Sequence, residues 1–162
     1  MARVALVTGG TRGIGAAISV ALKAAGRKVV ASYAGNDAAA AAFTKETGIP
    51  HIRFDAGDYA ACEAAVKQIQ AEHGPIEILV NNAGTVSQVK FDELEVAEFD
   101  RVISVNLRGV FLGCRFVLPE MLQRGSGKII NVASQLGQIG GLEMVHYSAS
   151  KAGVIGLTKA LA

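Results

Sequence analysis

The hydrophobic positions of this chain alternate between two periodicities from the first residues onward. Short apolar runs bounded by glycine or polar residues are typical of strands that are buried on both faces. Such runs occur at residues 4–8, 29–31, 52–54, 78–80 and 129–132. Apolar side chains recur at helical spacing over residues 14–25, 37–46, 59–72 and 96–123, and again from about residue 144. Strands that alternate with helices predict an α/β fold, with a parallel sheet covered by helices on both sides.

Residues with strong preferences for helix ends mark several boundaries in this pattern. Asn36 and Asp58 stand where N-terminal caps are expected, and Gly48 and Gly74 stand where the same two helices would stop. The predicted helix over residues 96–123 is long enough to contain a kink.

The length of the chain suits one domain. Of its 162 residues, 51% are hydrophobic and 19% are charged, and this balance predicts a packed core rather than disorder. The final helix is still periodic at Leu157 and Leu161, and no glycine, asparagine or proline follows it. We therefore predict a single domain over residues 1–162 that is incomplete at its C-terminus.

Charge and cysteine content narrow the classes of partner. The net charge of +2 comes from scattered basic residues, which predicts no nucleic-acid partner. No apolar run approaches the ~18 residues of a membrane span, so we expect no membrane partner and a cytoplasmic location. Cys62 and Cys114 lie far apart in predicted helices and are predicted to be reduced. His51 and His73 stand apart, so no metal site is predicted.

A glycine-rich turn joins the first predicted strand to the first helix. Residues 8–15 read Thr-Gly-Gly-Thr-Arg-Gly-Ile-Gly. Glycines allow a tight turn and the close approach of a pyrophosphate, and the helix N-terminus offers free N–H groups. A plain turn with a helix cap is the alternative, but the strand–turn–helix context favours dinucleotide binding. The candidate cofactor-binding residues here are Gly9, Thr11, Arg12, Gly13, Ile14 and Gly15.

The end of the second predicted strand indicates which dinucleotide is bound. An acid at this place would hold the ribose 2′-hydroxyl of NAD. Tyr33 stands there after Ser32, and neither is acidic, whereas Asp37 comes too late and begins the next helix. Arg12 can supply positive charge to a 2′-phosphate, although it could also be an ordinary surface residue. The pattern favours NADP over NAD.

Ser134, Tyr147 and Lys151 form a spaced set near the end of the chain. Ser134 follows the strand at residues 129–132, where open α/β sheets place ligands, and it can donate a hydrogen bond to a carbonyl oxygen. Tyr147 and Lys151 share one face of the last helix, and a nearby cation favours the phenolate form of a tyrosine. The alternative is an exposed helix with an ordinary tyrosine and lysine. His146 would point elsewhere and is predicted to be structural or on the surface.

These features, together with Asn-Asn-Ala-Gly at residues 81–84, resemble the short-chain dehydrogenase/reductase family. The turn at residues 8–15 differs from the G-x-G-x-x-G of two-domain dehydrogenases and matches that family's T-G-x3-G-x-G. The resemblance covers the whole chain. It implies a nicotinamide cofactor and a doubly wound, Rossmann-like parallel sheet, for which we expect the strand order 3-2-1-4-5.

The resemblance also implies roles for the spaced set. Ser134 would position and polarise a substrate carbonyl, and Tyr147 would donate a proton as hydride arrives from the nicotinamide. Lys151 would assist Tyr147 and hold the nicotinamide ribose, and Tyr147 is also expected to contact the cofactor. Asn106 would bind a water that links Lys151 to solvent, whereas the alternative is an asparagine satisfied by the backbone.

Further positions acquire cofactor roles through the same resemblance. Asp55 follows the third predicted strand and would meet the adenine, although it could simply begin a turn. The residues expected to line the cofactor cleft after the fourth strand are Asn82, Ala83 and Gly84.

Family members carry further strands, a substrate lid and more of the cofactor contact, and this chain is expected to lack them. The strand at residues 129–132 would then be an exposed edge. In the family, the helix corresponding to residues 96–123 and the last helix meet their copies across a two-fold axis. The resemblance therefore implies a homodimer or homotetramer.

Different parts of the chain resemble different members of the family. Residues 1–84 look most like bacterial acetoacetyl-CoA reductases. Residues 133–138 and 145–147 are similar to broad-range ketone, sugar or polyol dehydrogenases and to 3-oxoacyl carrier-protein reductases. We predict NADP-dependent reduction of a 3-oxoacyl thioester or similar small carbonyl to an alcohol. The alternatives are a polyol or sugar dehydrogenase, a non-catalytic nucleotide-binding fragment, and a structural or interaction piece.

Overall fold

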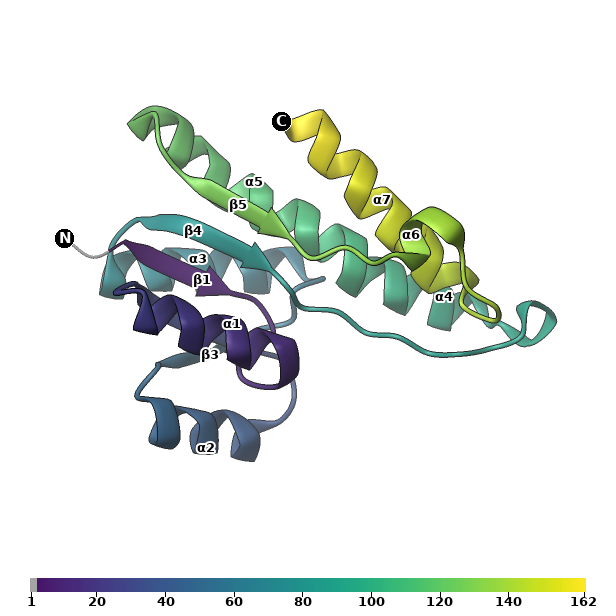
Figure 1. Cartoon of the computed structure of the whole chain (residues 1–162), viewed down its shortest axis with the longest axis horizontal. Coiled ribbons are helices and arrows are strands. Elements are labelled where there is room, and N and C mark those ends of the chain that lie inside the picture. The colour runs from purple at the N-terminus through teal and green to yellow at the C-terminus, as the bar shows by residue number, and fades with distance from the viewer. Residues whose placement is uncertain (1–2) are drawn as a thin grey trace.

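The computed structural model describes residues 3–162 and confirms the predicted parallel sheet (Figure 1). The five strands are β1 (Val4–Val7), β2 (Lys28–Tyr33), β3 (His51–Arg53), β4 (Ile76–Asn81) and β5 (Lys128–Asn131). They pair in the order β3-β2-β1-β4-β5, and every pairing is parallel. The predicted strand order is therefore confirmed, and β5 forms one edge of the sheet.

Helices cover both faces of the sheet, as the alternating pattern predicts. The longer helices are α1 (Gly13–Ala24), α2 (Asp37–Thr47), α3 (Tyr59–His73), α4 (Val96–Ile103), α5 (Gly109–Arg124) and α7 (Val145–Leu161). Successive residues of β1 point to opposite faces, and all four are buried. Ala5 and Val7 share a cluster with side chains of α1 and α2, whereas Val4 and Leu6 pack with α3 and α5. This two-sided burial explains why the strands are apolar throughout rather than alternating.

The predicted helix boundaries are confirmed in detail. The side chain of Asn36 accepts a hydrogen bond from the Ala39 backbone at 2.9 Å, and Asp58 accepts one from Ala61 at 2.7 Å. Each caps the N-terminus of the helix that follows. Gly48 and Gly74 end the same helices with φ values of +66° and +98°, which an L-residue adopts only with strain.

The long predicted helix is continuous over Val96–Arg124 and changes its winding in the middle. A π-helical segment, η2 (Ser104–Arg108), joins α4 to α5 and supplies the expected irregularity. Within residues 3–162 this is the one helix long and apolar enough to cross a membrane, a test that the core helix of a soluble protein also passes. Its side chains Val110 and Cys114 pack against Val154 of α7, and 44% of its most apolar window is buried.

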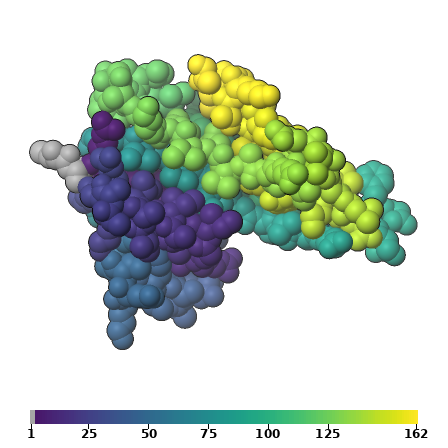
Figure 2. All heavy atoms as spheres, in the orientation of Figure 1, coloured from purple at the N-terminus to yellow at the C-terminus, as the bar shows by residue number. Residues whose placement is uncertain are grey.

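Two short elements are absent from the predicted pattern. They are η1 (Phe91–Glu93) and α6 (Leu136–Ile139), and neither is long enough to show helical periodicity. Figure 1 shows α6 beside α7, and Figure 2 shows the segment around η1, in teal, projecting at the end of the molecule away from α1 and α2. The loops next to these two elements are joined by hydrogen bonds, because Val89 N donates to Glu143 O at 2.9 Å and Gln88 donates to the Glu143 carboxylate at 3.1 Å.

Candidate active site

The glycine-rich turn needs its glycines for two different reasons. Gly9 and Gly13 have φ values of +62° and +53°, in the left-handed region that glycine tolerates. Gly15 lies at the start of α1, where a Cβ atom would stand only 2.1 Å from the carbonyl oxygen of Gly9. The turn is therefore folded so tightly onto the helix that a side chain at Gly15 would collide with backbone.

Asn82 and Thr8 tie this turn to the end of β4. Asn82 Nδ2 donates to the carbonyl oxygens of Thr8 and Gly9, at 3.0 and 3.2 Å. In return, Thr8 Oγ1 accepts from the backbone N–H groups of Asn82 and Ala83, both at 3.0 Å. The Gly9 N–H donates to Ser32 Oγ at the end of β2, at 3.2 Å. The carboxyl ends of three strands are thus locked around one turn.

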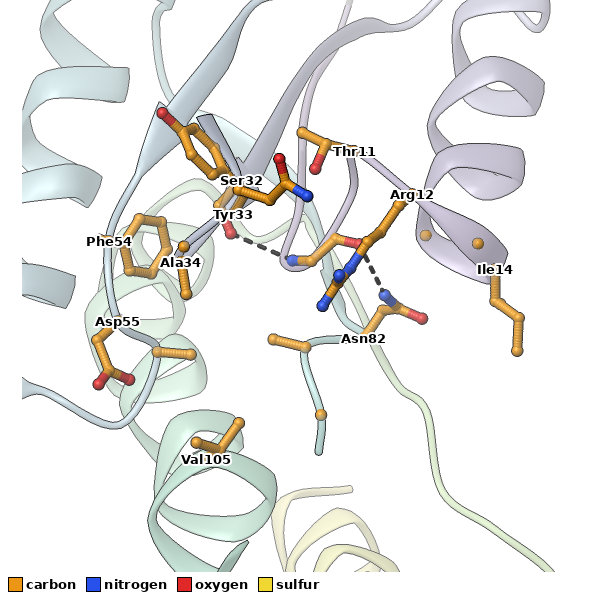
Figure 3. Close-up of a pocket in the computed structure, with 18 of the residues that line it drawn as sticks. Thr11, Arg12, Ile14, Ser32, Tyr33, Ala34, Phe54, Asp55, Asn82 and Val105 are labelled. Carbon is orange, nitrogen blue, oxygen red and sulfur yellow. Dashed lines mark hydrogen bonds between the residues drawn. The ribbon is translucent and has the colours of Figure 1, made fainter. Parts of the chain in front are cut away.

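A cavity of about 610 Å³ opens above this turn (Figure 3). Its size falls in the range of small-molecule and cofactor sites. Eleven of the predicted cofactor-binding residues line it: Gly9, Thr11, Arg12, Gly13, Ile14, Gly15, Tyr33, Asp55, Asn82, Ala83 and Gly84. The cradle left by Gly9, Gly13 and Gly15 and the start of α1 suit a pyrophosphate. By this test, the residues present fit a dinucleotide.

Several lining residues were not among the predicted candidates. Ser32, Ala34 and Phe54 flank predicted positions, and the rule that ligands bind at strand ends could have found them. Arg101 and Val105 come from the α4–η2 helix, which reaches the cavity from the side (Figure 3 labels Val105). No sequence signal marks these two, because their place depends on how the long helix crosses the sheet.

The end of the cavity next to β2 holds the residues that are expected to determine whether NAD or NADP is bound. Arg12 is exposed at the rim, and Tyr33 packs edge-on against His51 with ring centroids 5.3 Å apart. Partial burial raises the pKa of Tyr33, and a hydrogen bond with Asp37 raises it further. Asp37 is itself 3.4 Å from the Arg53 guanidinium, and it starts α2 as predicted. Arg12 therefore supplies the positive charge at this end of the site, because Arg53 is paired with Asp37 and does not line the cavity.

Asp55 combines the two roles considered for it. It lines the cavity, and its Oδ1 also accepts a hydrogen bond from the Gly57 backbone at 2.8 Å. The turn that follows β3 is therefore stabilised by the same carboxylate that faces the cavity.

Lys151 lies at the boundary between the cavity and α7. It is 5% exposed, its Nζ donates to the Val132 carbonyl oxygen at 2.8 Å, and this burial lowers its pKa. The ammonium group stands 5.8 Å from the centroid of the Tyr147 ring. A Cβ atom on Gly84, which lines the cavity, would be 3.9 Å from Lys151 Nζ. Tyr147 and Lys151, the other two predicted cofactor-binding residues, do not line the cavity, which ends beside them.

Ser134 is held near the same helix by the short helix α6. Its Oγ accepts from the Leu136 backbone at 3.2 Å, so its own hydrogen is free to donate elsewhere. Gly137 packs so closely on α7 that a Cβ atom there would be 2.7 Å from the carbonyl carbon of Lys151. Together with the Lys151–Val132 hydrogen bond, this contact joins the end of β5 to α7.

Asn106 is fully buried in the π-helical segment and makes three hydrogen bonds. Its Oδ1 accepts from the Thr85 backbone at 2.8 Å, and its Nδ2 donates to Thr85 O at 2.9 Å and to Ser150 Oγ at 3.1 Å. Two of these three bonds go to the backbone of Thr85, as in the alternative given for Asn106. Asn106 attaches the segment after β4 to the long helix and to α7. A water relay through Asn106 stays a prediction.

Three other residues with reactive side chains have structural surroundings. His146 is fully buried, its Nε2 lies 2.8 Å from Ser87 Oγ, and the structural alternative predicted for it is therefore the one observed. Cys62 and Cys114 are both free and buried, and burial raises the pKa of Cys62 to about 11.

Substituting Gly15→Ala is expected to destabilise the protein by about 1–3 kcal/mol and to weaken dinucleotide binding, because the new methyl group overlaps the Gly9 carbonyl. Urea unfolding and NADPH titration measure the two effects. Gly156→Ala is the matched control, since a Cβ atom there meets open space in a helix, and a gain of about 0.5–1 kcal/mol is expected. Unchanged stability and binding in Gly15→Ala would contradict the assigned close approach.

A glycine-lined cavity at the carboxyl ends of a doubly wound parallel sheet defines a Rossmann-like nucleotide-binding protein. Residues 3–162 match the family described as short chain dehydrogenase. The chain belongs to this short-chain dehydrogenase/reductase family of NAD(P)-dependent oxidoreductases.

Individual relatives extend this result along the whole chain. The acetoacetyl-CoA reductases of Rhizobium meliloti and Paracoccus denitrificans are each 52% identical to it, over 100% of this chain and 67% of their own length. A 3-oxoacyl-[acyl-carrier-protein] reductase of Staphylococcus aureus is 38% identical, over 100% of this chain and 68% of its own. The chain thus spans about two thirds of the length of these relatives, and the resemblance inferred from its motifs is confirmed.

Proposed function

We propose that this protein uses NADPH to reduce the ketone of a 3-oxoacyl thioester, or of a similar small carbonyl compound, to a secondary alcohol. The observation that carries the proposal is the place of Gly84, which lines the dinucleotide cavity and stands beside Lys151 Nζ. A cavity that ends at a buried cation next to a tyrosine suits a reaction in which a carbonyl receives both hydride and proton. The printed names of the relatives support the choice of substrate class.

In this proposal, each side chain of the site has one task. The Ser134 hydroxyl donates to the substrate carbonyl oxygen, because its Oγ already accepts from Leu136 and keeps its hydrogen free. A nicotinamide dinucleotide, held by the residues of the glycine-rich turn, would supply the hydride for the new C–H bond. The Tyr147 hydroxyl gives its proton to the carbonyl oxygen, which completes the alcohol. Lys151 holds positive charge beside the ring and stabilises the phenolate left behind.

The oxidation of NADPH, followed by absorbance with acetoacetyl-CoA as substrate, tests the proposal directly. Turnover that requires the thioester supports it. A higher kcat/KM for the oxidation of a polyol or sugar with NADP would assign the site to a polyol dehydrogenase instead. Binding of NADPH without turnover of either substrate class would instead support the alternative of a non-catalytic nucleotide-binding protein.

We assign the preference for NADPH to Arg12, because the residue at the end of β2 is Tyr33 and not an acid that would hold the ribose 2′-hydroxyl of NAD. We expect NADPH to bind more tightly than NADH, and Arg12→Ala to narrow this difference by about 1–2 kcal/mol through the loss of a charge-assisted hydrogen bond. Fluorescence titration with both cofactors measures it. Arg27→Ala, an arginine outside the cavity, should leave the difference unchanged. Equal affinities in the unmutated protein would refute the assignment.

The proposal includes a homo-oligomer and a cytoplasmic location. Exposed apolar side chains lie on the long helix and on α7, namely Val96, Phe99, Phe111, Val145 and Leu161. Two copies that pair through these helices would cover them. Light scattering is expected to give a dimer or larger species, and a well-behaved monomer would contradict this part of the proposal.

A further inference from the structure

A chain of polar side chains runs from the cofactor cavity to the first turn of α7. Arg101, which lines the cavity, donates through Nε and Nη2 to the Glu98 carboxylate at 2.7 and 2.8 Å. Ser87 Oγ donates to the same carboxylate and lies 2.8 Å from His146 Nε2. His146 immediately precedes Tyr147 on α7. Four residues from three separate segments therefore connect the cofactor site to the neighbour of the proposed proton donor.

The hydrogen bonds among these four side chains can run in only one consistent direction. Hydrogen bonds from Arg101, and secondly from Ser87, lower the pKa of Glu98 to about 2, so the carboxylate is ionised near neutral pH and can only accept. Ser87 has a single hydrogen, which goes to Glu98, so its oxygen must accept from His146. His146 therefore donates to Ser87 through Nε2.

This arrangement is not that of a hydrolase. In a Ser-His-acid triad the carboxylate bonds to the imidazole, which then removes the serine proton. Here the carboxylate bonds to Ser87 instead, and His146 Nδ1 is buried without a partner among the described residues. The group is thus arranged to hold its members in place rather than to activate Ser87.

Ser87 is a firm point of attachment because the segment before it is fixed twice. Asn106 bonds to both backbone groups of Thr85, and Arg101 Nη1 donates to Thr85 Oγ1 at 2.8 Å. The first turn of α7, in contrast, has no side-chain cap, since Met144 makes no such hydrogen bond. The buried imidazole of His146 attaches this turn to the segment after β4. Ser150 Oγ is a second attachment, because it accepts from Asn106 and donates to the Tyr147 carbonyl oxygen at 2.6 Å.

We propose that His146 is a positioning residue, which holds Tyr147 in its reactive place by anchoring the first turn of α7 to Glu98 through Ser87. The inference rests on the proposed reductase function. A misplacement of about 1 Å costs up to about 100-fold in rate. Loss of the anchor should therefore lower kcat, while the cofactor cavity, which is lined mainly by residues at the ends of β1, β2, β3 and β4, stays intact.

The test compares four variants of the purified protein: His146→Leu, His146→Gln, Ser87→Ala and the control Ser148→Ala. We expect His146→Leu and Ser87→Ala each to lower kcat for acetoacetyl-CoA about 10- to 100-fold without changing the Kd for NADPH. The double variant His146→Leu/Ser87→Ala should have a kcat close to that of either single variant, because both substitutions break the same series of hydrogen bonds. His146→Gln should restore most of the rate, since its amide can donate to Ser87. Ser148 adjoins Tyr147 and its Oγ has no hydrogen-bond partner within residues 3–162, so Ser148→Ala should match the unmutated protein.

Three results would overturn the proposal. The first is a folded His146→Leu or Ser87→Ala protein with unchanged kcat, and the second is a loss of rate that His146→Gln does not restore. The third is a nitrogen-15 NMR spectrum of the unmutated protein that shows no proton on Nε2 of His146, a measurement that stays decisive where a variant fails to fold. If the unmutated protein reduces no 3-oxoacyl thioester, the proposed function fails, and the NMR spectrum, which needs no turnover, still reports separately whether the anchor exists.

Discussion

Replacing Tyr147 by phenylalanine is expected to lower kcat by about 10²–10⁴-fold, the range that a positioned acid–base group contributes. The substitution removes one hydroxyl and keeps the ring, so packing near Lys151 should be retained. Tyr147 does not line the dinucleotide cavity, and NADPH affinity should therefore change little. Steady-state kinetics with acetoacetyl-CoA and a fluorescence titration with NADPH separate these two effects.

Tyr59→Phe is the matched control for this prediction. Tyr59 packs edge-on against Phe116 with ring centroids 5.1 Å apart and does not line the cavity. Its hydroxyl has no assigned task, so kcat should not change. Full turnover in Tyr147→Phe would show that another group donates the proton.

Replacing Lys151 by methionine is expected to separate activity from stability. The kcat/KM should fall about 10²–10³-fold, because the charge beside Tyr147 is lost. The free energy of unfolding at neutral pH should change far less. Removing a desolvated charge is favourable, whereas the Val132 carbonyl loses its donor, and the two effects offset each other.

The pH dependence of stability gives a second measurement on Lys151. Its pKa is lowered in the folded protein, so between that value and the ordinary lysine value of about 10.5 the unfolded chain binds more protons. Stability contributed by this group therefore rises with pH through the window just below 10.5. Urea unfolding in that window should show the rise in the unmutated protein and in Lys159→Met, an exposed lysine on the same helix, but not in Lys151→Met. An identical pH profile in all three proteins would be inconsistent with a buried Lys151.

The order of elements and the cofactor turn could be predicted because their signals are local. Two-sided burial makes each strand continuously apolar, and the caps at Asn36 and Asp58 depend on atoms three residues away. The need for glycine at Gly9 and Gly13 is likewise a property of the backbone at those positions. Spacing placed Tyr147 and Lys151 on one helix face, but their roles came from the family resemblance and not from spacing alone.

The surroundings of the site were decided only by the tertiary structure. His146 reads as an ordinary helix residue, yet it meets Ser87, which is 59 positions away in the sequence. Arg101 enters the cofactor cavity because the long helix crosses the sheet edge, a placement that no periodicity within the helix encodes. Sequence patterns by themselves determined which elements form and where a phosphate can approach, since these depend on neighbours a few residues apart. Which side chains meet between β4, α4 and α7 depends on packing between distant segments, and that is settled only when the whole sheet and its helices come together.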